Sequence, residues 1–564
     1  MSEFDFDAIV VGSGITGGWA AKELTEAGLK VLMLERGRMI EHQTGYGNET
    51  KAPWEMPFRG VGDADLYARE YQVQVRNRHF NEFTQDHFVN DAVNPYVNAP
   101  GTDFTWYRSY QLGGRSLTWG RQSYRWSDYD FGANKRDGQG TDWPIRYADV
   151  APWYDKVEDF IGVSGAAEGL PQLPDGKFQP PMALNVVEQA TREKIMARWP
   201  ERRLTIGRTA NLTVAKDEEG RAACQNRSIC ARGCSYGAYF STQSSTLPAA
   251  QKTGRLTLMT DAVVEKVDYD PRTRRVTGVR WIDTATKTRK AATARMVFLN
   301  AGSFNSVHLM LNSASEAMPR GLANSSGVLG THIMDHASTL SAIALMPGYE
   351  GYTTFGNRPT GVVIPRFRNM DALDGKGHSR GFSYQGGALQ SGWTRGKREA
   401  GIGADYKNGL QAPGPWRMVL VAFADCVPRA TNRLTLSRTK ADANGLPALE
   451  IAFAFGAEEK AALADAKAEA AAMLTHAGGQ VIMGLDTPNP GGGAIHEMGG
   501  ARMGLDPKTS VLDRFSRAHD AGNLFVTDGA QMSSSACQNP SLTYMALTAR
   551  AAAHAVERLK AGAL

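Results

Sequence analysis

The chain has 564 residues, 42% apolar and 21% charged, a globular composition over a length that predicts two domains, which could be interleaved. The net charge of +5 is small for this length and Lys and Arg are scattered, which excludes a nucleic-acid footprint. No apolar run approaches the roughly 20 residues of a membrane span, and the opening MSEFDFD lacks the features of a signal peptide, so these residues alone predict a protein that is cytoplasmic or exported by another route.

The N-terminal stretch 6–36 carries a dinucleotide-binding pattern. Short apolar runs at 8–11 and 31–34 predict two buried strands joined by a helix over about 17–27. The acid Glu35 closes the second strand, and the intervening turn has G-x-G-x-x-G spacing at Gly12, Gly14 and Gly17. The glycines would let the backbone approach a pyrophosphate at the helix N-terminus, and Glu35 would accept ribose hydroxyls. The alternative is a glycine-rich turn that binds nothing.

The next segments are less regular. Residues 46–99 lack periodicity and predict a surface excursion, whereas 106–131 is dense in aromatic residues around Gly113 and Gly114. Consecutive glycines permit close approach of the backbone to a ligand, and the rings could stack on a flavin or a sugar, or simply fill the core.

Later segments alternate between strand and helix patterns. A buried strand at 296–299 ends in Asn300-Ala301-Gly302 and enters an apolar helix, which would return the chain to the nucleotide domain. Residues 335–455 predict an antiparallel sheet walling a substrate site, and 458–476 predicts a helix.

The C-terminal region holds the candidate chemistry. His496 lies in IHEMGGARMG, and a strand at 524–527 ends in Asp528-Gly529. Asn539 and Pro540 predict a helix start, with Asn539 as the N-cap. A helix N-terminus aimed at a flavin would stabilise the negative charge of its reduced ring. A zinc motif H-E-x-x-H is excluded because position 500 is glycine.

Together these blocks, with GTHIMDH at 330–336, resemble the glucose–methanol–choline (GMC) oxidoreductases. The resemblance implies an α/β fold in which a Rossmann-like FAD-binding domain (1–45, 100–135, 224–334 and 490–564) is interleaved with an antiparallel-sheet substrate domain (46–99, 136–223 and 335–489). It implies His496 as the catalytic base and Asn539 as its partner, flanking the substrate hydroxyl carbon in front of flavin N5. A structural histidine is the alternative for His496.

The resemblance also implies a set of cofactor-binding residues. These are Gly12, Gly14, Gly17, Glu35, Arg36, Gly113, Gly114, Ser116, Thr118, Val264, Ala301, Gly302, Asp528, Gly529, Asn539 and Pro540. Some sugar-oxidising relatives attach FAD through a histidine two positions after the Ser of G-G-x-S. That position is Thr118 here, so non-covalent FAD is expected.

Three of the five cysteines, Cys224, Cys230 and Cys234, have C-x5-C-x3-C spacing. A disulfide would leave one thiol over, and a zinc site would need a fourth ligand where no His is near. Three thiolates fit a [3Fe–4S] cluster. The spacing is similar to that in the catalytic subunits of three-subunit FAD-dependent sugar dehydrogenases. Cys426 and Cys537 are interpreted as plain buried residues.

That narrower resemblance implies a cytochrome c as electron acceptor. It also implies a small chaperone-like subunit carrying the export signal, a membrane association only through a partner subunit, and a periplasmic location, with the cytoplasm as fallback. The block at 232–250 is most similar to glucoside 3-dehydrogenases, which oxidise the C3 hydroxyl of glucosides to 3-keto sugars. Gluconate, fructose and glucose dehydrogenases share the same framework.

Two further classes of protein compete with this interpretation. An oxidase of the same fold would use oxygen, and it would not need the one-electron relay that the cysteines predict. A non-catalytic or NAD-binding Rossmann protein would share the N-terminal fingerprint, but it would have no use for His496 and Asn539.

Overall fold

The computed structural model describes residues 4–354, 356–397 and 399–564. Within them a seven-stranded sheet has the order β5-β2-β1-β8-β7-β6, with β16 also paired to β8. Its strands are β1 (Phe6–Val11), β2 (Val31–Leu34), β5 (Leu256–Met259), β6 (Ala262–Asp270), β7 (Arg275–Asp283), β8 (Thr288–Leu299) and β16 (Leu524–Val526). The long strand β8 runs parallel to β1 and β16 near its end and antiparallel to β7 near its start.

Both faces of the parallel part are buried, which explains its unbroken apolar runs. Ala8 and Val10 pack with Ala20 and Leu24 of helix α1, while Ile9 and Val11 join the main core on the other side. The helices of this half are α1 (Ile15–Glu26), α5 (Tyr147–Ile161), α7 (Thr246–Lys252), α8 (Ser303–Asn312) and α11 (Ser541–Lys560).

A second, six-stranded sheet has the order β15-β9-β12-β11-β10-β4. Its strands are β4 (Thr205–Ile206), β9 (Ala337–Leu345), β10 (Val362–Ile364), β11 (Phe382–Gln390), β12 (Trp416–Ala424) and β15 (Gln480–Met483). All its pairings are antiparallel. Side chains on one face pack against α6 (Val186–Arg198) and α10 (Ala457–His476).

Residues 335–455 do not all join one sheet, contrary to the sequence prediction. Strands β13 (Arg433–Ala441) and β14 (Pro447–Ala452) form a separate small sheet with β3 (Val97–Asn98). The reason is that β14 pairs in parallel with β3, which belongs to the excursion. The remaining helices are α2 (Ala64–Glu70), α3 (Asp128–Phe131), α4 (Ala133–Asp137) and α9 (Gly403–Gln411).

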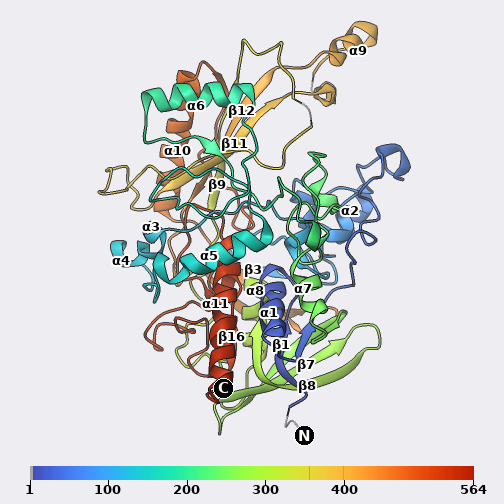
Figure 1. The fold of residues 1–564 in the computed structure, drawn as a ribbon, viewed down its shortest axis with the longest axis vertical. Coiled ribbons are helices and arrows are strands. Elements are labelled where there is room, and N and C mark those ends of the chain that lie inside the picture. The colour runs from blue at the N-terminus through green and yellow to red at the C-terminus, as the bar shows by residue number, and fades with distance from the viewer. Residues whose placement is uncertain (1–3, 355, 398) are drawn as a thin grey trace.

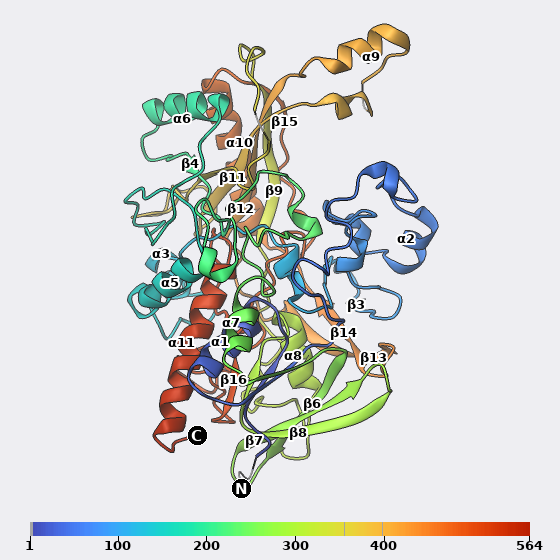
Figure 2. The ribbon, with the colours of Figure 1, turned by 45° about the vertical axis from the view of Figure 1, so that its right-hand side comes forward.

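The two sheets lie one above the other along the long axis of the molecule, and both chain ends are at the bottom, in the nucleotide half (Figure 1). In Figure 2 the excursion with α2 stands beside the centre, and α9 projects from the top. The α/β class with an antiparallel second sheet is confirmed, while the residue boundaries of the two domains stay a prediction. None of the described helices is long and apolar enough to cross a membrane.

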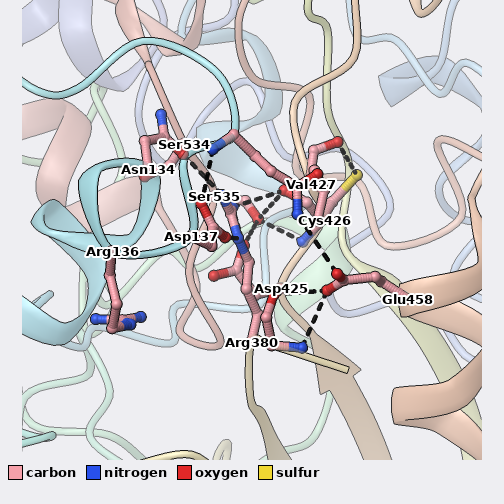
Figure 3. A network of polar contacts seen from close by, with 12 residues as sticks. Asn134, Arg136, Asp137, Arg380, Asp425, Cys426, Val427, Glu458, Ser534 and Ser535 are labelled. Carbon is pink, nitrogen blue, oxygen red and sulfur yellow. Dashed lines mark hydrogen bonds and ion pairs between the residues drawn. The ribbon is translucent and has the colours of Figure 1, made fainter. Parts of the chain in front are cut away.

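A buried ion-pair network around Arg380 and Asp425 joins segments of the two halves (Figure 3). The guanidinium of Arg380, just before β11, donates to Asp425 at the end of β12 (3.2 Å), to Asp137 (2.7 Å) and to Asn134 (2.7 Å). The hydroxyl of Ser535, shortly before α11, donates to Asp425. Burial alone would lower the pKa of Arg380, but Asp425 and Asp137 reverse that effect and raise it.

We expect Arg380→Met to lower the free energy of unfolding by about 3–5 kcal/mol, because it leaves buried carboxylates without their cation. Guanidinium titration measures the loss. The matched control is Arg272→Met, since Arg272 pairs with Asp270 but is 90% exposed, and its replacement should change stability by less than about 0.5 kcal/mol. Equal stability of the two variants would contradict the prediction.

Candidate active site

A cavity of about 230 Å³ lies at the carboxyl ends of the parallel strands, the usual ligand position in such sheets. Most of the sequence-predicted cofactor residues line it: Gly12, Gly14, Glu35, Arg36, Gly114, Ser116, Thr118, Val264, Ala301, Gly302, Asp528, Gly529 and Pro540. Gly17 and Gly113 lie behind this wall, and Asn539 lines a neighbouring cavity.

The glycines have different roles in the first turn. A Cβ on Gly17 would lie 1.9 Å from the Gly12 carbonyl oxygen, and one on Gly12 would lie 2.4 Å from that of Asn300, so both permit close packing of the backbone. A Cβ on Gly14 would meet nothing within 4 Å. No side chain caps α1. The free N–H groups and the open space at Gly14 therefore fit a pyrophosphate.

Glu35 is buried at the end of β2, and its carboxylate accepts from Ser13 N (3.1 Å), Ser13 Oγ (2.5 Å) and Gly37 N (2.9 Å). Burial raises the pKa of Glu35. Ser13 Oγ in turn accepts from Gly113 N (2.8 Å), which fixes the start of the short helix η4 (Gly114–Leu117) against the nucleotide loop. These hydrogen bonds fix the Glu35 carboxylate in the wall of the cavity, where the sequence predicts contact with ribose hydroxyls.

The opposite side of the cavity is organised by Asp528. Its carboxylate accepts from Gly302 N (3.0 Å) and from Ser306 Oγ (2.5 Å) at the start of α8. Burial raises the pKa of Asp528 to about 6. Pro540 and Ser541 bring the N-terminus of α11 into the same cavity, and no side chain caps that helix. A negatively charged ring system would find free N–H groups there.

His496 and Asn539 face each other beside this cavity. Asn539 Nδ2 lies 3.0 Å from His496 Nε2. Gln385 Nε2 donates to Asn539 Oδ1 at 2.5 Å, so the amide nitrogen of Asn539 is free to donate to His496. The lone pair of His496 Nε2 therefore points toward Asn539. A hydroxyl placed between the two would accept from the amide and donate to the imidazole.

The far side of the His496 ring contacts a second histidine. His496 Nδ1 lies 3.0 Å from Nδ1 of the buried His336, which is possible only if one nitrogen carries the proton. Because His496 Nε2 is the acceptor, its Nδ1–H donates to His336. Asp335 accepts from the backbone of Ala494 (3.2 Å) and His496 (3.0 Å). These three side chains are close enough to hold a metal ion, but each already has a partner within the cluster.

Two features keep His496 neutral and in place. Burial, with the nearby His336 and Arg115, lowers the pKa of His496 well below the ordinary histidine value. Arg115 itself is paired with Glu497 through two hydrogen bonds, of 3.0 and 2.6 Å. The preceding residue, Ile495, has a φ of 60°, a left-handed conformation that is strained for a β-branched side chain and sets the direction of His496. A neutral imidazole can accept a proton.

A second cavity of about 1480 Å³ opens on the other side of the histidine. Six residues line both cavities: Asn77, His79, Tyr107, Thr118, Ile495 and His496. The wall of the larger one includes strands β9, β11 and β12. His496 therefore stands where the cavity at the nucleotide loop meets the larger cavity at the second sheet.

The three clustered cysteines lie on one loop beside η4, and none of them is in a disulfide. Burial raises the pKa of Cys224, and the neighbouring Cys230 and Cys234 add to the effect. A Cβ on Gly233 would lie 2.5 Å from the ring of Tyr46, and Tyr46 packs with Leu117 of η4. The ring of Tyr46 thus lies between the cysteine loop and η4, which forms part of the wall of the nucleotide cavity.

Sequence reasoning misses part of this site. His336 and Asp335 lie in the GTHIMDH block, but the block alone predicts no role for them, and nothing in the sequence indicates Gln385. The prediction that Asn539 caps α11 is wrong. The helix begins at Ser541 after Pro540, and the Asn539 side chain is occupied by His496 and Gln385.

Residues 6–338 and 428–548 match the two family models described as GMC oxidoreductase. The chain belongs to the GMC oxidoreductase family. The 2-methyl-1,2-propanediol dehydrogenase of Mycolicibacterium austroafricanum is 28% identical over 97% of this chain and 94% of its own length. The fructose dehydrogenase large subunit of Gluconobacter japonicus is 26% identical over 99% and 98%. Pyridoxine 4-oxidase from Mesorbium loti, 15% identical, has the same fold, with a TM-score of 0.59 over 97% of this chain and 98% of its own.

This GMC oxidoreductase is therefore a flavoprotein acting on CH–OH groups, and the first cavity fits FAD. Bound there, FAD supplies the acceptor for the hydride of the carbinol carbon. In the chain itself, Asn539 Nδ2 and His496 Nε2, 3.0 Å apart, are a donor and an acceptor that could bind a substrate hydroxyl at the mouth of this cavity.

We expect His336→Leu to slow flavin reduction by substrate about 10- to 100-fold, because the buried Nδ1–H of His496 loses its acceptor and the ring loses its orientation. His336→Asn, whose Oδ1 can accept from nearly the same position, should stay within a few-fold of the native rate. Stopped-flow bleaching of the flavin measures both. If the two variants react equally fast, the histidine pair does not orient the base.

Proposed function

We propose that the protein is an FAD-dependent dehydrogenase that oxidises a secondary hydroxyl of a sugar or glucoside, the C3 hydroxyl in particular, giving a 3-keto product. The observation that carries this proposal is the position of His496 at the junction of the two cavities, with Asn539 beside it in the larger one. A secondary carbinol reaching this junction loses its hydroxyl proton to His496 Nε2 and its hydride to the acceptor.

The sugar assignment has two supports. A relative that aligns with nearly the whole chain is a fructose dehydrogenase large subunit. The block at 232–250 resembles glucoside 3-dehydrogenases, and within it Tyr239 donates to the Leu117 carbonyl (2.8 Å) and Thr242 N to Ser116 Oγ (3.1 Å). The block therefore supports η4, which lines the FAD cavity. FAD is held non-covalently, since Thr118 occupies the position of the linking histidine.

Cys224, Cys230 and Cys234 are proposed to hold a [3Fe–4S] cluster. The free thiols and the mutual effect of the three sulfurs on the Cys224 pKa support a shared site. The guanidinium of Arg227, 3.9 Å from Cys234 Sγ, would offset thiolate charge. Such a cluster supplies one-electron transfer, which a haem acceptor requires. The cysteine loop packs on Tyr46, which in turn packs on η4 beside the nucleotide cavity, and this short connection suits electron transfer from the flavin.

The partners follow from the same proposal. A cytochrome c takes the electrons, and a small subunit carries the export signal, so the enzyme works in the periplasm after export in the folded state. The relative named as a large subunit supports an assembly of several chains. A cluster inserted before export would require a folded route.

The proposed reaction predicts a defined product. Methyl glucoside and a cytochrome c, incubated with the purified enzyme, should give the 3-keto glucoside, identified by NMR of the isolated sugar. His496→Ala should lower turnover by about 10²–10⁴-fold while FAD stays bound. A keto group at another carbon would overturn the regiochemistry, and an unreactive flavin with every sugar tested would overturn the sugar assignment.

The cluster predicts that substitution of Cys230 separates the two half-reactions. Cys230→Ser should retain bleaching of the flavin by sugar but lose most cytochrome c reduction, because the proposed cluster serves electron exit and takes no part in hydride transfer from the sugar. Cys426→Ser is the matched control, since Cys426 is buried elsewhere. Iron analysis should give about three iron atoms per native chain. Zinc in place of iron, or full cytochrome-linked turnover by metal-free protein, would contradict the cluster.

A further inference from the structure

The strand β12 is apolar on both faces, although only one face packs on helices. Met418, Leu420 and Ala422 are fully buried in the core with α6 and α10. The alternate residues Val419, Val421 and Phe423 are half-buried and line the 1480 Å³ cavity. An antiparallel sheet that covers a core with one face normally carries polar residues on the face toward water. An apolar face toward a cavity of this size indicates a ligand.

The apolar surface continues across the sheet to the rim of the cavity. Leu340 of β9 is paired with Val421, and the amide of Leu485 donates to the Leu340 carbonyl (2.8 Å). Leu389, at the end of β11, and Leu485 line the cavity although they are 62% and 48% exposed. We call Leu340, Leu389, Val419, Val421, Phe423 and Leu485 the apolar floor.

The floor begins at the catalytic histidine and extends well beyond it. The ring centroid of Phe423 lies 6.0 Å from that of His496. Gln385, which donates to Asn539, is paired with Val421 across the sheet. Leu389 is paired with Arg417, the residue of β12 farthest from Phe423 on the face toward the cavity. Three two-residue steps of about 6.8 Å separate Phe423 from Arg417, so the floor is about 20 Å long. Only the first step is needed to place one hydroxyl at His496.

Arginines belong to a mixed polar lining of the cavity that also includes Asn185, Glu188 and Gln390, and their guanidinium groups can stack on an aromatic ligand. Arg76, Arg78, Arg121 and Arg232 line the same cavity. Burial, with Arg78 and Arg121, lowers the pKa of His79 to about 4. Guanidinium groups stack on aromatic faces, and apolar side chains pack against the opposite face of such a ring.

We propose that the apolar floor is the binding site for an aromatic aglycone, so that the substrate is an aryl glycoside whose sugar lies at His496. The identity of the sugar half rests on the proposed function. The aglycone half rests on the floor itself. A disaccharide of similar length would leave most of this surface without a polar partner.

The test compares phenyl β-glucoside with methyl β-glucoside on the FAD-loaded enzyme. The ratio of their kcat/KM values should be at least tenfold in favour of the phenyl glycoside. Val419→Asp should lower that ratio at least tenfold, because a charge replaces apolar surface away from the reacting carbon. Leu485→Ser, at the exposed rim, is the second variant if Val419→Asp does not fold. Val481→Thr, an exposed position outside the cavity, is the control and should keep the native ratio.

Calorimetric binding of both glycosides separates this inference from the proposed function. If neither glycoside bleaches the flavin but the phenyl compound still binds at least tenfold more tightly, and Val419→Asp removes that difference, the proposed reaction fails and the aglycone site stands. A native ratio near one, a ratio unchanged in both variants, or a stronger preference for a disaccharide overturns the aglycone site.

Discussion

The contact between His496 and His336 is the constraint on which the site depends. A catalytic base next to a flavin must be neutral before the reaction and charged during it. A carboxylate on His496 Nδ1 would stabilise the charged form in the resting enzyme and raise the pKa of the base. The chain instead provides a neutral imidazole at 3.0 Å, while the nearby Asp335 is turned to the backbone amides of Ala494 and His496. Burial keeps the base neutral at rest, and the Nδ1–H of His496 retains a neutral hydrogen-bond acceptor that holds the ring in place.

This contact requires segments that are distant in the sequence to be positioned accurately relative to one another. His336 precedes β9, Gln385 lies on β11, His496 follows β15, and Asn539 precedes α11. His336 and Gln385 belong to the substrate sheet or its flanks, whereas His496 and Asn539 belong to the C-terminal segment that the sequence assigns to the nucleotide half. The buried network of Arg380 and Asp425 joins those halves at the ends of β11 and β12, close to the segment that carries Asn539 (Figure 3). The cost of burying that charge is compatible with a role in fixing one arrangement of the two halves.

The parts of this structure that could be predicted are those whose physics is local. The glycine turn, its strands and Glu35 lie within 31 residues, and Gly12 and Gly17 are needed for close backbone contacts within that unit or with Asn300 just after β8. The contact between Asn539 and Gln385 spans 154 positions, and that between His336 and His496 spans 160. No periodicity or spacing encodes such pairs. Asn539 shows the limit of prediction from sequence. Its neighbours in the sequence favour a helix cap, whereas in the structure its side chain is hydrogen-bonded to His496 and Gln385.

The shape of the larger cavity explains how a bulky substrate and an electron path can share one side of the flavin site. The apolar floor belongs to the substrate sheet, whereas Cys230 and Arg232 line the same cavity from the cysteine loop, which packs on the nucleotide half through Tyr46. A ligand lying along β12 would therefore cover the sheet and leave η4 and Tyr46 open to the proposed electron path. If the aglycone lay on the cysteine loop instead, substrate and acceptor would compete for the same surface. Placing the apolar surface on the sheet removes that competition.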